Sequence, residues 1–217
     1  MRKDKPPGAK KRFGMLSNTE ISGMTRSGVD TMDNSSTSKP ASGVRGLVLV
    51  YTGNGKGKTT AALGLALRQI GWGRRVLVIQ FMKGKGNVYG ERIAAEKYLP
   101  LLEIEQHGRD EFVNLGDPAT VDRDLAAKAL ARAKEAFASG KYGMVVLDEV
   151  NVAIACGLVE TSDVLALLKE RPQELDVVLT GRYCPQEIMD AADAVSEVKE
   201  LKHHFQKRVA AREGIEY

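Results

Sequence analysis

Residues 47–60 read LVLVYTGNGKGKTT, an apolar run followed at once by a glycine-rich turn and a lysine–threonine pair. The run has the length of a strand, and residues 59–70 after the turn have the apolar spacing of a helix. Glycines in such a turn let successive backbone N–H groups converge on phosphate oxygens. A glycine-rich turn between a buried strand and a helix therefore predicts a phosphate-binding loop, or P-loop.

The candidate phosphate-binding residues lie in this turn and at the start of the helix: Gly53, Asn54, Gly55, Lys56, Gly57, Lys58, Thr59 and Thr60. The helix N-terminus adds unpaired N–H donors and the positive end of its dipole. We expect Lys58 to carry charge to the terminal phosphates and the Thr59 hydroxyl to bind Mg²⁺. The usual spacing requires a glycine at position 52, which is a threonine here. The loop is thus effectively short, and we expect it to hold a polyphosphate in a displaced register, with a bond other than β–γ facing the chemistry.

Further apolar runs alternate with helical segments along the chain. Strands are predicted at 76–81, 102–105, 144–147, 175–179 and 194–198, and helices at 91–98, 162–171 and 185–192. A long helix is predicted with Asp117 as its N-cap, Pro118 at its first position and Gly140 as its stop. This alternation is typical of an α/β fold with a mostly parallel sheet and helices on both faces. We expect a RecA-like P-loop nucleotide-binding domain over residues 45–217.

Charged residues follow two of these strands. Asp148 and Glu149 come directly after the run at 144–147, where a P-loop protein holds Mg²⁺, so either carboxylate is expected to reach the metal, directly or through water. Arg182 follows the run at 175–179, and it is either a clamp for phosphate charge or an ordinary surface arginine. Arg68, late in the first helix, is either a ligand contact or a salt-bridge partner.

Composition narrows the class of protein. The chain has 217 residues, 43% of them apolar, and no apolar run long enough to cross a membrane. Cys156 and Cys184 show neither a disulfide framework nor metal-ligand spacing, so we expect a reducing, cytoplasmic compartment. Residues 1–44 hold the whole +4 net charge, and residues 45–217 are balanced. The basic balance therefore describes this tail, which is predicted either to be disordered or to form a lid over a ligand. No nucleic-acid partner is expected.

Several motifs together are more specific than a P-loop alone. They are the stretch 51–62, Gln80-Phe81-Met82-Lys83-Gly84, Leu147-Asp148-Glu149-Val150-Asn151, Leu179-Thr180-Gly181-Arg182, Lys202-His203-His204-Phe205 and Gly214-Ile215-Glu216-Tyr217. In this combination residues 45–217 closely resemble the P-loop-type ATP:cob(I)alamin (corrinoid) adenosyltransferases. The resemblance implies that the Co(I) of a reduced corrinoid attacks C5′ of ATP and that triphosphate is released.

The resemblance also implies roles for individual residues and partners. Lys58 and Arg182 would be catalytic, Gly53 to Thr60 and Arg68 would bind the nucleotide, and Thr59 with Glu149 would hold Mg²⁺ or Mn²⁺. An electron-donating flavoprotein, a homodimer and an N-terminal segment that closes over the substrate are implied as well. Because axially ligated cobalt is hard to reduce, His203 and His204 would not ligate it. Phe112 could fill one position of the Phe/Trp pair that many family members carry; the tryptophan has no counterpart here.

Two other functions compete with adenosyl transfer. A P-loop ATPase or kinase would use Glu149 to activate the attacking group at the β–γ bond. A nucleotide-dependent binding module would contact nucleic acid through the basic tail. The short loop and the 202–205 segment favour the transferase.

Overall fold

The computed structural model describes residues 44–86, 88–111 and 116–217. Within these ranges the strands are β1 (Val48–Thr52), β2 (Val76–Phe81), β3 (Leu102–His107), β4 (Met144–Asp148), β5 (Asp176–Thr180) and β6 (Ala194–Glu197). The helices are α1 (Lys58–Gly71), α2 (Gly90–Tyr98), α3 (Thr120–Ser139), α4 (Val150–Ala155), α5 (Thr161–Glu170), α6 (Gln186–Ala191) and the short 3₁₀ helix η1 (His204–Lys207). All six predicted strands are present, so the predicted α/β alternation is confirmed.

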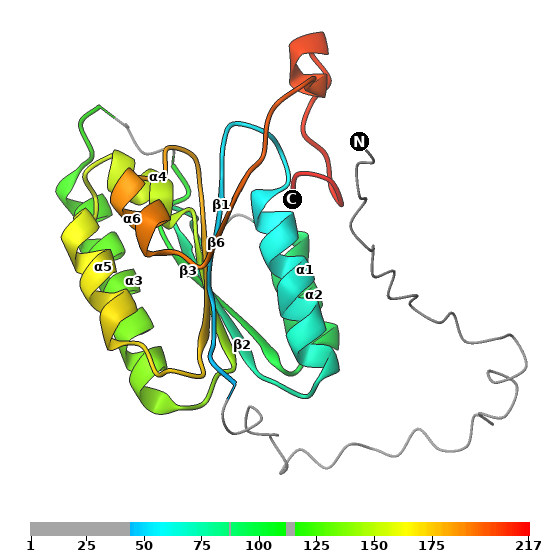
Figure 1. The fold of residues 1–217 in the computed structure, drawn as a ribbon. Helices are drawn as coiled ribbons and strands as arrows, with labels where there is room; N and C mark the ends of the chain where they lie inside the picture. Colours follow the sequence, from blue (N-terminus) through cyan, green and yellow to red (C-terminus); the bar gives the residue numbers. More distant parts are fainter. Residues whose placement is uncertain (1–43, 87, 112–115) are drawn as a thin grey trace, which may run out of the picture. The chain divides into compact units, whose positions relative to one another are not determined.

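The strands form one sheet in the order β3-β2-β4-β5-β1-β6, and every neighbouring pair is parallel (Figure 1). Strand β5 lies between β1, which leads into the P-loop, and β4, which ends at Asp148. In a parallel sheet the carboxyl ends of all strands meet at one edge, where α/β proteins bind their ligands. The topology therefore brings the P-loop, Asp148 and the turn after β5 to the same edge.

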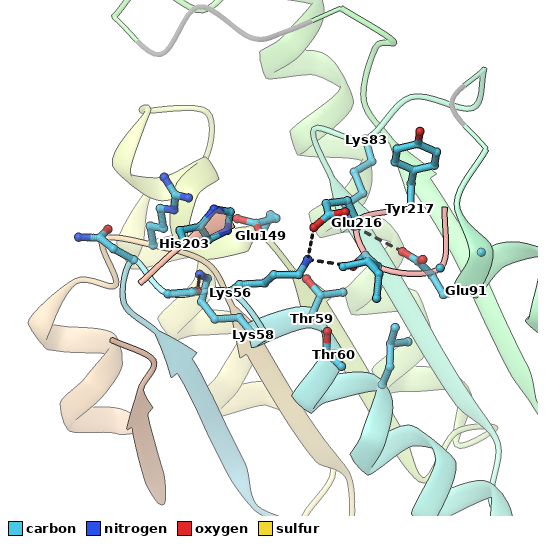
Figure 2. Close-up of a pocket in the computed structure, with 18 residues that line it drawn as sticks. Lys56, Lys58, Thr59, Thr60, Lys83, Glu91, Glu149, His203, Glu216 and Tyr217 are labelled. Atoms are coloured by element: carbon cyan, nitrogen blue, oxygen red, sulfur yellow. Dashed lines mark hydrogen bonds and ion pairs between the residues drawn. The ribbon is translucent and has the colours of Figure 1, made fainter. Parts of the chain in front are cut away.

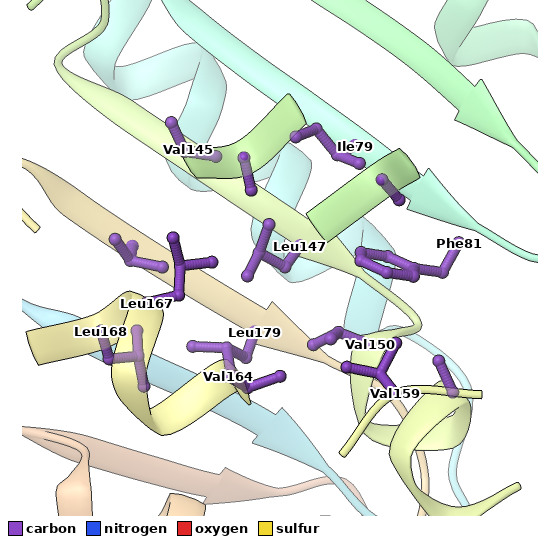
Figure 3. Packing of buried hydrophobic residues seen from close by; sticks show 14 of the residues in the cluster. Ile79, Phe81, Val145, Leu147, Val150, Val159, Val164, Leu167, Leu168 and Leu179 are labelled. Atoms are coloured by element: carbon purple, nitrogen blue, oxygen red, sulfur yellow. The ribbon is translucent and has the colours of Figure 1, made fainter. Parts of the chain in front are cut away.

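Helices cover both faces of the sheet (Figure 1). On one face α1 contributes Ala62 and Ala66 to a core with β2 and β4, and on the other α3 presents a stripe of buried alanines at helical spacing: Ala126, Ala129, Ala133 and Ala136. Such small side chains let a helix lie close to the sheet. Figure 3 shows the core on the α3 face of the sheet, in which Leu167 of α5 faces the buried side chains of the central strands.

Position in the sheet explains how polar each strand is. Strands β2 and β4 are buried at every residue because they are central and covered by helices on both sides. Strand β3 lies at the edge, where its acidic side chains find partners on neighbouring segments. Glu105 pairs with Arg132 at 3.0 Å, and Glu103 accepts a 2.6 Å hydrogen bond from the Tyr142 hydroxyl. These pairs allow the polar run to continue as a strand to residue 107.

The predicted start of the long helix is wrong by two residues, although its stop at Gly140 is confirmed. Helix α3 begins at Thr120, with Ala119 as its N-cap. The carboxylate of Asp122 accepts a hydrogen bond from the Ala119 N–H at 3.2 Å, so a residue inside the first turn caps the helix. Pro118 is buried ahead of the helix and does not open it.

Across the described ranges, no helix is both long enough and apolar enough to cross a bilayer. The predictions for the tail at 1–44 fall, apart from Val44, outside the described residues. Phe112 also lies outside them.

Candidate active site

The P-loop turns sharply from β1 into α1. Gly53 and Gly57 have φ values of 93° and 119°, in the region that favours glycine. Gly53 also has no room for a side chain, because a Cβ there would lie 2.6 Å from the carbonyl oxygen of Val198. The Gly55 N–H donates to the same carbonyl at 2.7 Å. The segment after β6 thus backs the loop, and the glycine at position 53 meets both a conformational and a steric requirement.

Lys58 lies inside this turn. Its ammonium group donates to the carbonyl oxygens of Gly53 and Gly55, each at 2.9 Å, and the residue is buried. Burial lowers the pKa of Lys58, and the neighbouring charge of Arg182 adds to that effect, while Glu149 and Asp148 oppose it. The loop therefore holds a cation at the centre of a phosphate cradle, with the N-terminus of α1 beside it.

Asp148 is the hub of the hydrogen bonds beneath the loop. It is fully buried, and its Oδ1 accepts from the hydroxyls of Thr59 and Thr180, both at 2.7 Å. Its Oδ2 accepts from Gln80 at 3.3 Å and from Lys83 at 3.0 Å. Four donors from separate segments hold this carboxylate, which fixes the P-loop helix to the edge of the sheet.

Glu149 has the opposite character. Its backbone is left-handed, with φ 64°, and its N–H donates to Thr180 Oγ1 at 2.9 Å. Its side chain faces the cavity. Burial raises the pKa of Glu149, and the neighbouring charge of Asp148 raises it further. Among the described residues, no hydrogen-bond donor is assigned to its carboxylate. Glu149 is thus the carboxylate at this edge that can still accept a ligand.

The cavity above these residues has a volume of about 450 Å³ (Figure 2). That volume lies within the range of sites for small molecules and cofactors. Its lining comes from the P-loop, from the start of α2, from the turns after the central strands and from the C-terminus: residues 54–60, Leu63, Lys83, Gly90, Glu91, Glu149, Arg182, His203 and 214–217. Cations dominate around the loop, as expected for a site that takes a polyphosphate.

Thr59 and Glu149 fit a divalent cation, and Asp148, whose oxygens already accept four hydrogen bonds, lies behind the Thr59 hydroxyl. Thr59 and Glu149 bring a hydroxyl and a carboxylate, the oxygen ligands that Mg²⁺ prefers, and a cation would relieve the repulsion between the two adjacent acids. Within the described part of the chain, no group of three His, Cys, Asp or Glu residues could hold a metal by itself. Mg²⁺ here would therefore need phosphate oxygens as additional ligands, as is usual for this ion.

The comparisons with known proteins agree with this geometry. The family model for the ATP:corrinoid adenosyltransferases BtuR/CobO/CobP matches residues 44–217. The chain belongs to this family. It is 39% identical to the corrinoid adenosyltransferase of Escherichia coli K12 and 38% identical to CobA of Salmonella typhimurium, in both cases over 80% of this chain and 86% of the relative. The resemblance seen in the sequence is confirmed.

Two further matches are less informative about corrinoid adenosyl transfer. An uncharacterized protein from Nostoc, all2391, is 42% identical over 79% of this chain, which spans only 48% of that relative's length. The crystal structure of the flagellar accessory protein FlaH from Methanocaldococcus jannaschii superposes with a TM-score of 0.51 at 15% identity, covering 70% of this chain and 71% of FlaH. At that identity the likeness concerns the fold alone.

Most of the predicted adenosyltransferase site residues lie together. The cavity is lined by P-loop residues 54–60 with Glu149 and Arg182, while Gly53 closes the loop and Asp148 lies directly beneath it. Arg68 does not join them: it is exposed, about 14 Å along α1 from Thr59, and it does not line the cavity.

Lys83 was not among the predicted site residues, although it lines the cavity. Its ammonium group lies 3.0 Å from Asp148 and 3.6 Å from Glu91, above the ring of Tyr89. Burial lowers the pKa of Lys83, but the charges of Asp148 and Glu91 outweigh it and leave that pKa raised. Its place two residues after a buried strand was the available signal, as it was for Arg182.

The C-terminal residues 214–217 also line the cavity, although they were not predicted as site residues. Gly214-Ile215-Glu216-Tyr217 carried the adenosyltransferase resemblance, but nothing in their types predicts that they border the P-loop. They contact Lys56, whose Nζ donates to the carbonyl of Ile215 at 2.8 Å and pairs with Glu216 at 3.4 Å. Contacts over about 160 residues depend on the fold and leave no local pattern.

Proposed function

We propose that this cavity binds ATP and is where the chain carries out the reaction of its family, transfer of the 5′-deoxyadenosyl group to a reduced corrinoid. In that reaction the electron pair of Co(I) forms a cobalt–carbon bond at C5′. The C5′–oxygen bond breaks, and its electron pair leaves with the triphosphate. The observation that carries the proposal is the convergence of Lys58, Glu149 and Arg182 on one cavity at the mouth of the P-loop.

The chain's contribution is to bind and orient ATP and to stabilise the leaving charge. Backbone N–H groups from Gly53 to Thr60 and the ammonium of Lys58 would hold the polyphosphate. Arg182 would face the charge that develops as the C5′–oxygen bond breaks. The nucleophile belongs to the corrinoid, so no protein group has to remove a proton.

Thr59 and Glu149 would hold Mg²⁺ or Mn²⁺, with Asp148 keeping the Thr59 hydroxyl in place. When bound, the divalent cation neutralises phosphate charge and helps to orient the triphosphate as a leaving group. The short P-loop also supports adenosyl transfer with release of triphosphate. If the whole triphosphate leaves, charge must be stabilised on the α-phosphate side, which a displaced register favours.

Each histidine near the cavity has one ring nitrogen in contact with residues 205–216, and the exclusion of both histidines as cobalt ligands stays a prediction. His204 Nε2 pairs with Glu216 at 2.9 Å, and His203 Nδ1 accepts from the Phe205 N–H at 3.2 Å. An apolar lower face for the corrin remains the expectation, and Phe112 stays a prediction for that role.

The remaining expectations are proposals too. We infer an electron-donating flavoprotein that supplies Co(I), a homodimer and a cytoplasmic location, on the strength of the family resemblance and the cysteine pattern. The division into a tail at 1–44, either disordered or forming a lid, and a P-loop domain at 45–217 also stays a prediction.

Anaerobic incubation with MgATP and chemically reduced cobalamin, followed by the corrin spectrum, tests this function. We expect the spectrum of adenosylcobalamin to develop only when ATP, Mg²⁺ and the chain are all present. An unchanged corrin spectrum with release of orthophosphate would instead support the ATPase hypothesis.

A further inference from the structure

The C-terminal strap, residues 203–217, forms one wall of the nucleotide cavity. It follows β6 and carries η1, and His203 together with residues 214–217 lines the cavity opposite the P-loop. Figure 1 shows this segment, in red, returning beside the start of α1. The volume of about 450 Å³ is what remains with the strap in place. The strap therefore bounds a space large enough for a nucleotide and does not fill it.

A tight turn presents the end of the strap to the P-loop. Gly214 has a φ of 75°, and its N–H donates to the Tyr217 carbonyl oxygen at 2.7 Å. Glu216 Oε2 accepts from the Arg212 N–H at 2.9 Å, which fixes the carboxylate on its own turn. These short-range bonds give the strap a defined shape before any ligand binds.

Glu216 joins the strap to the P-loop through Lys56, and it also contacts His204 within the strap. Its Oε1 lies 2.9 Å from His204 Nε2 and 3.4 Å from Lys56 Nζ, and its side chain is 18% exposed. Figure 2 shows Lys56 reaching across the cavity toward Glu216, with its second contact at Ile215. The Lys56 side chain is long and flexible, and 39% of it is exposed. Its two contacts with the strap therefore decide where its ammonium group lies.

We propose that Glu216 is a positioning residue for ATP: it holds the strap closed and keeps the Lys56 ammonium at the mouth of the phosphate cradle. The inference rests on the proposed function, because it assigns a role within the same site. A cation that is already fixed loses little conformational entropy when phosphate binds. The contact between Lys56 and phosphate therefore contributes more to the affinity for ATP. The role is indirect, since Glu216 acts through Lys56.

Equilibrium binding of MgATP, measured by calorimetry together with steady-state kinetics, tests the inference. Glu216→Gln keeps the shape of the side chain and removes its charge. We expect its dissociation constant and its KM for ATP to rise about fivefold, the upper end for losing a partly exposed ion pair, with kcat within about twofold of wild type. Glu216→Asp should recover part of the affinity.

Two controls separate positioning from a general effect. Glu213→Gln makes the same charge change on the exposed face of the strap and should bind MgATP like wild type. In a Lys56→Ala background, Glu216→Gln should weaken binding by less than about twofold more, because its target is already gone. Hydrogen–deuterium exchange of the unaltered chain should show slower exchange at 214–217 when MgATP binds.

Unchanged or tighter ATP binding in Glu216→Gln would overturn the inference, the tighter case meaning that Glu216 competes with phosphate for Lys56. Faster exchange of the strap with MgATP would overturn it as well. If the unaltered chain bound no MgATP at all, the proposed function would fail, and the inference with it.

Discussion

Thr59 Oγ1 donates a 2.7 Å hydrogen bond to Asp148 Oδ1, across 89 residues of sequence. The bond joins the first turn of α1 to the end of β4. Of the two adjacent acids Asp148 and Glu149, only Glu149 lines the cavity, together with Glu91 and Glu216. The bond links the phosphate-binding element to the acidic element, and it orients the hydroxyl expected to bind the metal.

Thr59→Val removes this hydroxyl while keeping the volume of the side chain. We expect the initial rate of MgATP-dependent adenosylation to fall about 10- to 100-fold and to need more Mg²⁺ for saturation, as happens when metal-site hydrogen bonds are lost. Thr59→Ser retains the hydroxyl and should stay within a few-fold of wild type. Equal rates for the valine and serine variants would contradict the role given to the hydroxyl.

Lys58→Ala removes the cation at the centre of the loop. We expect adenosyl transfer to fall by at least about 100-fold, because a group aimed at developing charge is lost. The matched control is Lys169→Ala, an exposed lysine in the last turn of α5, which should be unaffected. A Lys58→Ala enzyme that retained its activity would refute the assignment of the P-loop.

Lys83→Met leaves Asp148 and Glu91 without their shared cation. Without nucleotide or Mg²⁺, we expect the free energy of unfolding in urea to drop by about 3 kcal/mol, the cost of breaking a buried pair. Lys85→Met alters an exposed lysine in the same loop and should change that energy by less than about 0.5 kcal/mol. Similar losses in both variants would show that the ion pairs of Lys83 do not stabilise the fold.

Asp122 should make stability depend on pH. Hydrogen bonds from Arg109, at 2.7 and 2.8 Å, hold the pKa of Asp122 below its usual value, against the effect of burial. The ionised form therefore stabilises the folded state above the unfolded pKa of about 3.9, and this contribution is lost as pH falls toward the lowered folded pKa.

Asp122→Asn should accordingly lower the free energy of unfolding by about 2 kcal/mol near pH 7. The difference from wild type should shrink as pH falls from about 5 to about 3. Asp124→Asn, an exposed neighbour on the same helix, should show little difference at any pH. The measurement is urea unfolding at several pH values, and a constant difference for Asp122→Asn would rule out this linkage.

Local patterns predicted the elements but not all of their limits. The four inner strands could be predicted because apolar runs of four to six residues need covering on both faces of a sheet. The edge strands β3 and β6 were predicted from more polar runs. The start of α3 could not, since Asp122 caps the helix from inside, held there by Arg109 across the preceding loop. Helix α4 was missed because it is a single short segment of six residues directly after β4.

The same limit applies to the site. The P-loop and the Asp148–Glu149 pair lie next to strands, so strand order alone places them at one edge. Lys83 and Glu216 act through partners 65 and 160 residues away, and no pattern along the chain reports such contacts. Arg68 shows the converse, because a match to the family's motif gave no indication that it would be exposed, away from the cavity.

Product analysis tests the central claim most directly. The short loop is proposed to present the α-phosphate side of ATP, so one intact triphosphate should be released for each corrinoid adenosylated under anaerobic conditions with Mg²⁺. Recovery of triphosphate and adenosylated corrinoid in equal amounts is the predicted result. Orthophosphate and ADP beside an unaltered corrin would contradict it, because they require cleavage at the β–γ bond.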